Sequence, residues 1–321
     1  MGCSDVVSLA MIATVTLNPS LDEWVRLKTL KLGELNRASH MVRYPGGKGI
    51  NVSRVVRELG GQTVAYALAG GDDGEWLHRL LNHVRIRHAF VRVDGSTRNN
   101  YKIQTATHHV TEINTAGPAV TSASVQQLLR RLLRRRPVPR YAALCGSLPP
   151  GASPLTYHRW IRALRHRGIF TALDTSSAAL RHGLTAHPWL VKPNRQEAET
   201  VLGNRLTGRR ALLAAMRELL SRGPTLVILS LAREGALLAS AASREVWWAQ
   251  PPAITTNSAV GAGDSLVGGF LYGAMKRLPL LAAFQLGVAC GTAAAMTPGT
   301  ELCHHGDVKR LVPRVRIRRL A

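Results

Sequence analysis

The stretch Asn257-Ser-Ala-Val-Gly-Ala-Gly-Asp-Ser265 carries the strongest structural signal in this chain of 321 residues. Its small residues, Gly261, Ala262 and Gly263, allow backbone N–H groups to gather at the start of a helix predicted from Asp264 to Lys276. Unpaired N–H donors and the helix dipole stabilise negative charge at such a helix start. Asp264 adds a carboxylate that is placed to act as a base. Donors for a transferring group and a base for a hydroxyl are the parts that phosphoryl transfer requires.

A second glycine-rich turn, Tyr44-Pro-Gly-Gly-Lys-Gly-Ile-Asn-Val52, precedes another predicted helix, from Gly49 to Leu59. It is not a P-loop, because Val42 replaces the first glycine and Gly49 stands where Ser or Thr should follow Lys48. One glycine turn alone would fit an ordinary helix cap. The other segments of the chain are therefore needed to distinguish a helix cap from an anion-binding site.

Strand-like and helix-like segments alternate along most of the chain. Buried strands are predicted at residues 11–17, 64–69, 141–145, 170–174, 189–192 and 226–231, and further helices at 75–84 and 155–167. Repeated units of this kind imply an α/β fold with a doubly wound, mainly parallel sheet flanked by helices. Such sheets bind ligands at the carboxyl ends of their strands. That edge collects the polar residues Asn18, Asp22, Ser147, Asp174, Asn194 and Ser230.

Two stretches interrupt the alternation, at about residues 23–44 and 98–114, and both look like short strands without an intervening helix. We expect them to form a small antiparallel β lid over the site. The predicted organisation is a single domain over residues 11–313 with a basic tail at 314–321. Residues 1–10 are an extension, and Met11, which opens the first strand, is the expected native start.

The cysteines and the apolar segments exclude several protein classes. Four widely spaced cysteines without a C-x-x-C pair match neither a disulfide framework nor a zinc ribbon. The apolar stretch at residues 6–17 has no basic residues before it, which argues against an export signal. The uncharged segment 278–300 is rich in Gly and Ala, so we expect a buried helix and not a membrane span. A cytoplasmic protein without a membrane partner is the expectation.

Both glycine turns, together with Asp264, resemble the phosphofructokinase B group of the ribokinase-like carbohydrate kinases. The resemblance spans roughly residues 11–313, and its motifs follow the order of the group: Thr16-Leu-Asn-Pro-Ser-Leu-Asp22, Gly47-Lys-Gly-Ile-Asn51, Arg98 to Lys102, Thr111-Glu-Ile-Asn114, Gly146-Ser-Leu-Pro-Pro-Gly151, Lys192-Pro-Asn-Arg-Gln-Glu197, Gly261-Ala-Gly-Asp264 and Gly299-Thr-Glu-Leu-Cys303. Lys48 and the first and fourth of these motifs are most similar to 1-phosphofructokinases. The last motif and Ala69-Gly-Gly-Asp-Asp-Gly-Glu75 also resemble minor 6-phosphofructokinases.

The resemblance implies a ribokinase-like fold and an ATP- and Mg²⁺-dependent kinase for a ketohexose phosphate. The expected reaction converts fructose 1-phosphate to fructose 1,6-bisphosphate. The activities of a 6-phosphofructokinase or a tagatose-6-phosphate kinase are alternatives within the group. The resemblance also implies a homodimer formed through the lid.

Site residues follow from the resemblance where the motifs match. Asp264 would be the base, and the amides of Gly261, Ala262 and Gly263 would form an anion hole. The residues expected around the sugar phosphate are Asp22, Gly47, Lys48, Asn51, Arg98, Asn100 and Ser147. Those expected around the nucleotide are Lys192, Asn194, Ser230 and Gly235, with Asn194 and Glu197 organising Mg²⁺.

The resemblance also implies individual roles within these sets. Asp22 would accept hydrogen bonds from sugar hydroxyls, while Lys48, Arg98 and Asn100 would meet the phosphate of the sugar, where Arg adds bidentate geometry. By contrast, Lys102 and Glu112 are expected to be solvated salt-bridge partners.

Three positions depart from the pattern of the group. Ser177-Ala178 replaces a usual Gly-Glu, Ala232 replaces a usual glycine in the nucleotide segment, and Ala259 replaces a usual Thr before the anion hole. An alanine reduces the backbone freedom that glycine provides. We expect these changes to affect nucleotide binding without removing a catalytic group.

The net charge supports an alternative of a different class. The chain has 42 Lys+Arg and 19 Asp+Glu residues, a formal charge of +23, which attracts polyanions. A nucleic-acid-binding protein on an inactive kinase fold is therefore the alternative of a different class. Only 5% of the residues are aromatic and they form no base-stacking pattern, while Asp264 is retained. We expect any nucleic-acid binding to be non-specific.

Overall fold

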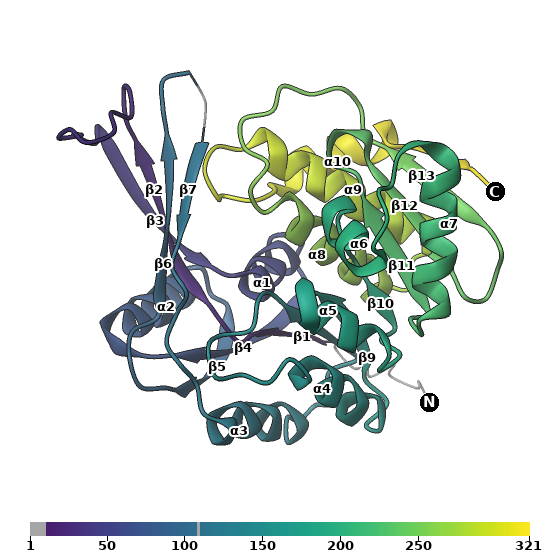
Figure 1. Cartoon of the computed structure of the whole chain (residues 1–321), viewed down its shortest axis with the longest axis horizontal. Coiled ribbons are helices and arrows are strands. Elements are labelled where there is room, and N and C mark those ends of the chain that lie inside the picture. Colours follow the sequence, from purple (N-terminus) through teal and green to yellow (C-terminus); the bar gives the residue numbers. More distant parts are fainter. Residues whose placement is uncertain (1–10, 108–109) are drawn as a thin grey trace, which may run out of the picture.

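A computed structural model of the chain describes residues 11–107 and 110–321. Its main sheet has the order β14-β13-β12-β11-β10-β9-β8-β1-β4-β5 (Figure 1). The parallel strands are β1 (Met11–Thr16), β4 (Gln62–Ala69), β5 (Arg87–Arg92), β8 (Tyr141–Cys145), β9 (Phe170–Asp174), β10 (Leu190–Val191) and β11 (Leu226–Ser230). Three antiparallel strands extend one edge: β12 (Ala236–Ser240), β13 (Val246–Gln250) and β14 (Arg316–Arg319). The predicted doubly wound, mainly parallel sheet is confirmed.

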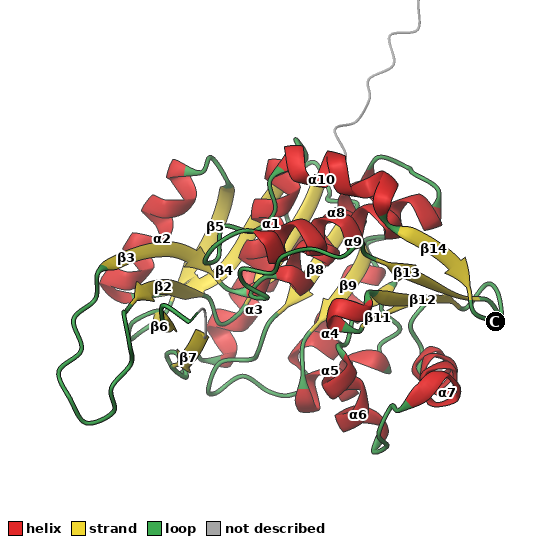
Figure 2. Cartoon of the chain, turned by 90° about the horizontal axis from the view of Figure 1, so that it is seen from above, coloured by secondary structure: helices red, strands yellow, loops and turns green. Residues whose placement is uncertain are grey.

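Helices cover both faces of this sheet (Figure 2). One face carries α1 (Lys48–Glu58), α2 (Gly71–His83), α8 (Ala262–Met275), α9 (Leu280–Met296) and α10 (His305–Leu311). The other carries α3 (Ser122–Leu133), α4 (Thr156–Arg165), α5 (Ser177–Leu184), α6 (Arg195–Leu202) and α7 (Gly208–Ser221). Side chains alternate along each strand, so Ile12 packs in one core while Ala13 and Val15 pack in the other.

Close contact between α8 and α9 explains the uncharged segment at 278–300. Gly269 lies so near Cys290 and Gly287 that a Cβ at Gly269 would come within 2.5 Å of the Cys290 sulfur. The small residues thus let the two helix backbones approach each other, and α9 is a buried helix as predicted. In the part of the chain that the structure describes, no helix has both the length and the apolar character needed to cross a bilayer.

The lid is a second sheet with the order β3-β2-β6-β7, which stands beside α1 and α2 (Figure 1). Its strands are β2 (Ser20–Arg26), β3 (His40–Gly46), β6 (Arg98–Gln104) and β7 (Val110–Asn114). The two hairpins are antiparallel, but the central pair, β2 and β6, is parallel. The pairing follows from chain direction, because β2 and β6 both follow parallel strands of the main sheet, β1 and β5, whose carboxyl ends share one edge.

The basic tail differs from its prediction. Residues 316–319 form β14, which pairs with β13, and the preceding Val315 is buried in the core under α9 and α10. Charged residues suit an exposed edge strand, because they discourage pairing with other chains. The domain therefore extends past residue 313 to the edge strand. The expectation that Met11 is the native start concerns residues 1–10, which lie outside the described residues.

Candidate active site

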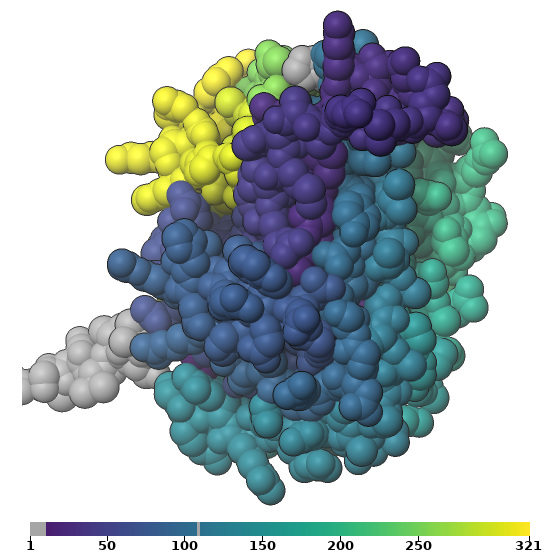
Figure 3. Space-filling view, turned by 90° about the vertical axis from the view of Figure 1, so that its left-hand side faces the viewer, coloured from purple at the N-terminus to yellow at the C-terminus, as the bar shows by residue number. Residues whose placement is uncertain are grey.

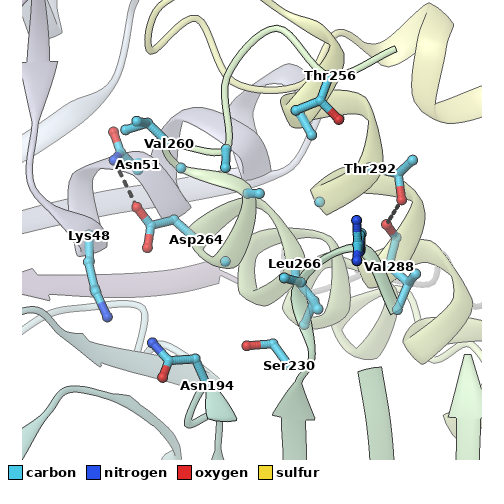
Figure 4. Close-up of a pocket in the computed structure, with 18 of the residues that line it drawn as sticks. Lys48, Asn51, Asn194, Ser230, Thr256, Val260, Asp264, Leu266, Val288 and Thr292 are labelled. Carbon is cyan, nitrogen blue, oxygen red and sulfur yellow. Dashed lines mark hydrogen bonds between the residues drawn. The ribbon is translucent and has the colours of Figure 1, made fainter. Parts of the chain in front are cut away.

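A cavity of about 1110 Å³ lies between the carboxyl edge of the main sheet, the lid and the start of α8 (Figure 4). Residues from β2, β6 and β7 line the lid side, and the first glycine turn contributes Gly47, Lys48 and Asn51. Gly261, Ala262, Gly263 and Asp264 lie in its wall. Both glycine-rich turns thus meet in one cavity, which favours an anion site over two unrelated helix caps.

The turn before α8 needs glycine for two reasons. Gly261 has a φ of 76°, the left-handed region that favours glycine, and a Cβ there would clash with Leu302. Gly263 faces Lys192, whose Nζ would lie 3.4 Å from a Cβ at that position. Since no side chain caps α8, the turn presents backbone to the cavity instead of a capping group. Lys192 adds a positive charge beside it.

Asp264 is buried, and Asn51 Nδ2 donates a hydrogen bond of 2.8 Å to its Oδ2 (Figure 4). Burial and the neighbouring carboxylate of Asp174 raise the pKa of Asp264 to about 6, against the lowering effects of Lys48, Asn51 and Lys192. Such a carboxylate is still ionised at pH 7 but accepts a proton more readily than an exposed one. These properties suit a general base.

Asp174 holds two lysines at the end of β9. Its Oδ1 lies 2.9 Å from Lys48 Nζ and its Oδ2 lies 3.3 Å from Lys192 Nζ. Burial alone would raise the pKa of Asp174, but the two lysines outweigh it and lower that pKa. Burial likewise disfavours the charge on Lys48, yet Asp174, Glu197 and Asp264 raise its pKa above the usual value. Lys48 is therefore charged beside the start of α8.

A second buried ion pair lies under the lid, between Asp22 and Lys102. Lys102 Nζ is 2.7 Å from Asp22 Oδ2, while Ser20 Oγ and Asn100 Nδ2 donate to Oδ1 at 2.9 and 3.2 Å. The expectation that Lys102 is solvated is wrong, since only 3% of the residue is exposed. Strand alternation explains it, because Lys102 is two residues from Asn100 and points to the same face of β6. Glu112, on β7, is exposed at the cavity rim, as expected for a solvated residue.

Arg98 lines the cavity with its guanidinium bound to backbone. Its Nε and Nη2 donate to Asn18 O at 3.3 and 3.1 Å, and Nη1 donates to Thr115 O at 3.2 Å. Burial lowers the pKa of Arg98, although Asp22 partly offsets this. Ser147 is exposed outside the cavity lining, where its Oγ accepts a 3.4 Å bond from Asn18 Nδ2. The structure thus brings Arg98, but not Ser147, into the cavity.

Asn194 and Glu197 cap α6. Asn194 Oδ1 accepts from the Glu197 N–H and Glu197 Oε2 accepts from the Asn194 N–H, both at 2.8 Å. The other Glu197 oxygen, Oε1, lies 3.6 Å from Lys48 Nζ. Within the described ranges no three His, Cys, Asp or Glu side chains form a metal cluster. Mg²⁺ is compatible nonetheless, because it takes one or two carboxylates and completes its shell with water and phosphate. The nearest carboxylate oxygens are Glu197 Oε1 and Asp174 Oδ2, which face Lys48 Nζ at 3.6 Å and Lys192 Nζ at 3.3 Å, so Mg²⁺ would share them with these two lysines. Both carboxylates lie behind the lysines, outside the residues that line the cavity, whereas Asn194 is in the lining.

The far end of the cavity is largely apolar. Leu266, Val288 and Thr292 from α8 and α9 face Ser230 across it (Figure 4), and Pro251–Ile254 with the 3₁₀ turn η1 (Ala232–Glu234) complete the wall. Gly235 follows with a φ of 95°, and a Cβ there would clash with the Ala249 carbonyl. An apolar slot with a few polar groups fits an aromatic base.

Three charged residues of the site received no role from the sequence: Asp174, Lys102 and Arg54. Asp174 lies at the predicted sheet edge, and its position as the last residue of a strand is the signal that indicates it. Lys102 could have been found from alternation with Asn100. Arg54 follows Asn51 by three residues on a helix, where the two side chains share a face.

Comparison with known proteins agrees with this geometry. The profile of the pfkB family carbohydrate kinases matches residues 15–305. A 1-phosphofructokinase of Bacillus subtilis is 36% identical over 97% of this chain and 100% of its own length. An ATP-dependent 6-phosphofructokinase isozyme 2 of Mycobacterium tuberculosis is 33% identical over 93% of this chain and 88% of its own.

A solved structure gives the same result for the fold. Phosphofructokinase-2 of Escherichia coli in complex with substrates and products superposes with a TM-score of 0.90, at 31% identity over 95% of this chain and 99% of that chain. The resemblance predicted from the motifs is thereby confirmed. The chain belongs to the pfkB family and is a carbohydrate kinase with the ribokinase-like fold of that family.

Proposed function

We propose that this protein transfers the γ-phosphoryl group of ATP to the 6-hydroxyl of fructose 1-phosphate, producing fructose 1,6-bisphosphate and ADP. The observation that carries the proposal is the position of Asp264, at the glycine-rich start of α8 in a cavity with lid cations at one end and an apolar slot at the other. The name of the Bacillus subtilis relative supports the choice of sugar phosphate.

The proposed reaction uses the residues of this chain in an in-line displacement. Asp264 takes the proton from the 6-hydroxyl as that oxygen attacks the γ-phosphorus and the bond to the ADP oxygen breaks. Charge on the transferring group is stabilised by the amides of Gly261–Gly263 and by the ammonium groups of Lys48 and Lys192. Glu197 and Asp174 would hold Mg²⁺, which supplies further charge stabilisation when bound.

Sugar binding falls to the lid and its neighbours. Asp22, whose carboxylate is oriented by Ser20, Asn100 and Lys102, accepts hydrogen bonds from sugar hydroxyls. Arg98 and Lys102 are the cations near the lid that attract the substrate phosphate. Lys48 pairs with Asp174 and Glu197, so we assign it to the transferring phosphoryl group as well as to the sugar phosphate predicted from the motif.

An assay of ADP release with three sugar phosphates tests the proposal. Fructose 1-phosphate should give the highest kcat/KM, ahead of fructose 6-phosphate and tagatose 6-phosphate. A preference for either of the latter would select the 6-phosphofructokinase or tagatose-6-phosphate kinase alternative. Inactivity of a folded preparation on all three would overturn the kinase proposal.

We also propose that the lid mediates a homodimer. Figure 3 shows the lid strands at the surface of the molecule, and Leu32, Leu35, Met41 and Ile113 of this region are more than half exposed. Met41 and Ile113 share one face of the lid, because they align with Ile103 and Tyr101, which are two residues apart on β6. Exposed apolar side chains of this kind favour a protein partner. Light scattering should give a mass near twice 34.8 kDa, and a lid variant carrying Met41→Glu and Ile113→Glu should shift toward the monomer.

A further inference from the structure

Arg54 lies one helical turn after Asn51 on α1, outside the residues that line the cavity, and contacts the side chain of Asn51. Its Nη1 donates to Asn51 Oδ1 at 3.2 Å and to Pro45 O at 3.3 Å, and its Nη2 donates to Glu301 O at 3.4 Å. The guanidinium also lies over the ring of Tyr44, 5.8 Å from its centroid. None of its acceptors is a carboxylate, so Arg54 is not part of an ordinary salt bridge.

These contacts determine which way the Asn51 amide points. A guanidinium has only donors, so the Asn51 atom that faces Arg54 has to be the carbonyl oxygen. The amide nitrogen then faces Asp264, and its 2.8 Å hydrogen bond to Oδ2 is a donor to the carboxylate. Arg54 thus sets the orientation of a side chain that contacts the proposed base.

The orientation has a chemical consequence for Asp264. A donor on Oδ2 favours the ionised carboxylate and leaves Oδ1 for the substrate hydroxyl. If the Asn51 amide turned over, its oxygen would face Asp264 and would favour the protonated acid. The positive charge of Arg54 acts in the same direction as the donor, because it favours the ionised form of a nearby carboxylate.

Arg54 also joins the two glycine-rich turns. Pro45 precedes Gly46 and Gly47 of the first turn, while Glu301 precedes Leu302, whose side chain packs against Gly261 of the second. Burial lowers the pKa of Arg54 to about 10, although Asp22, Tyr44 and Glu301 oppose the decrease. At neutral pH the guanidinium therefore remains charged and able to donate to all three oxygens.

We propose that Arg54 is a positioning residue that keeps Asp264 ionised by fixing the amide orientation of Asn51. The proposal rests on the assignment of Asp264 as the base. It is distinct from a structural role, because it predicts a change in the protonation of Asp264 and not only a loss of stability.

The pH dependence of kcat/KM for fructose 1-phosphate provides the first test. The wild type should lose activity below about pH 6. R54M should move this acidic limb to a higher pH by about one unit. At pH values below the limb, kcat/KM of R54M should therefore be about tenfold lower than that of the wild type. R54K, which keeps a charge and a donor, should shift the acidic limb in the same direction but by less than R54M does. R57M, an exposed arginine one turn further along α1, should match the wild type.

The second ionisation of the substrate phosphate is common to all four proteins, so it cancels when their profiles are compared. A uniform decrease in kcat for R54M with an unshifted acidic limb would overturn the proposal. If R54M does not fold, the same comparison is made with R54K, whose limb should lie above that of the wild type and of R57M. If the acidic limb of R54K then lay at the same pH as that of the wild type, the proposal would be overturned.

Unfolding measurements test the inference without substrate, and so separate its failure from failure of the proposed function. The difference in unfolding free energy between each protein and its D264N counterpart is followed from pH 4 to pH 8. This difference should stop changing near pH 6 in the wild-type background and about one unit higher in the R54M background. Coincident curves would refute the role of Arg54 even if the enzyme phosphorylates fructose 1-phosphate.

Discussion

Asp264 has neighbours that act on its pKa in opposite directions. Burial and Asp174 disfavour its charge, whereas Lys48, Asn51 and Lys192 favour it. The net pKa of about 6 leaves the carboxylate ionised at neutral pH but close to its titration range. The ionised form of Asp264 lowers the stability of the fold, because a buried carboxylate is solvated less well than it would be in water.

This cost can be measured with D264N. The folded pKa of about 6 lies above the ordinary value of 3.8, so the native state binds more protons and its stability falls as pH rises from about 4 to 6. At pH 7 and above, D264N should be more stable than the wild type by up to about 3 kcal/mol, and at pH 3.5 the gain should vanish. Urea denaturation across this pH range checks the prediction.

The D264N variant should also lose 10²-fold or more in kcat while still binding nucleotide.

Lys102 and Asp22 form a buried pair in which each residue depends on the other. Lys102→Met leaves the Asp22 carboxylate buried without its cation and should destabilise the fold by about 3 kcal/mol or more. The double variant D22N/K102M removes both charges and should recover part of this loss. Denaturation of the two single variants and the double variant gives the coupling energy. Additive effects would show that the two side chains do not interact.

Ala232 occupies a backbone conformation that glycine adopts at lower cost. Its φ is 51°, at the position where the motif resemblance predicts a glycine, and it is the first residue of the turn η1 beside the nucleotide slot. Ala232→Gly should stabilise the protein by about 0.5–1 kcal/mol, since relief of about 1–2 kcal/mol of strain exceeds the entropy cost of glycine. Ala242→Gly, in an exposed turn without a positive φ, should destabilise by about 0.4–1 kcal/mol. Thermal or urea denaturation compares the two.

At the scale of elements, the connections between the main sheet and the lid determine how the lid strands pair. The lid hairpins leave the carboxyl edge of the main sheet after β1 and β5, and this common direction makes β2 and β6 parallel neighbours. The last strand, β14, closes the opposite edge. Its sequence, Arg316-Ile-Arg-Arg319, resembles a solvated tail because only Ile317 points toward the core.

The packing of this last segment can be tested at Val315, which is 3% exposed. Val315→Ala should cost about 2 kcal/mol of unfolding free energy, from lost apolar burial and the cavity that remains. Arg316→Ala, at the neighbouring exposed position, should change stability by less than about 0.5 kcal/mol. If residues 314–321 were an unpacked tail, both variants would be neutral.

At the scale of the whole molecule, the net charge of +23 has two parts. Lys48, Lys102, Lys192 and Arg98 lie in the cavity, where they suit phosphorylated ligands. Most other arginines are on the surface, as on α3, where Leu128 and Leu132 are buried while Arg130 and Arg131 are exposed. Helix α3 is therefore amphipathic, with arginines on its exposed face.

Surface arginines should give only electrostatic binding to nucleic acid. The affinity for duplex DNA should fall steeply as salt rises from 50 to 200 mM and should not depend on DNA sequence. Fluorescence anisotropy with two unrelated duplexes measures both properties. Salt-resistant binding that prefers one duplex would instead favour a dedicated nucleic-acid function.

The order of strand–helix units, the two glycine-rich turns and the candidate base were predictable from the sequence. Each is encoded locally: periodicity marks strands and helices, and glycine marks backbone conformations such as that of Gly261. The carboxyl-edge rule for parallel sheets then placed Asp22 and Asp174 near the site. Lys48, Arg98 and the residues of the nucleotide segment also reached the cavity as expected.

Only the tertiary structure decided the partners of these groups. Asn51 and Asp264 are 213 residues apart, and the pairs of Lys48 with Asp174 and of Arg54 with Glu301 are likewise distant in the chain. No local pattern specifies such contacts, because they arise when separately encoded elements pack together. The same physical reason explains why Lys102 is buried, why β2 pairs with β6 in parallel and why the basic tail is a strand.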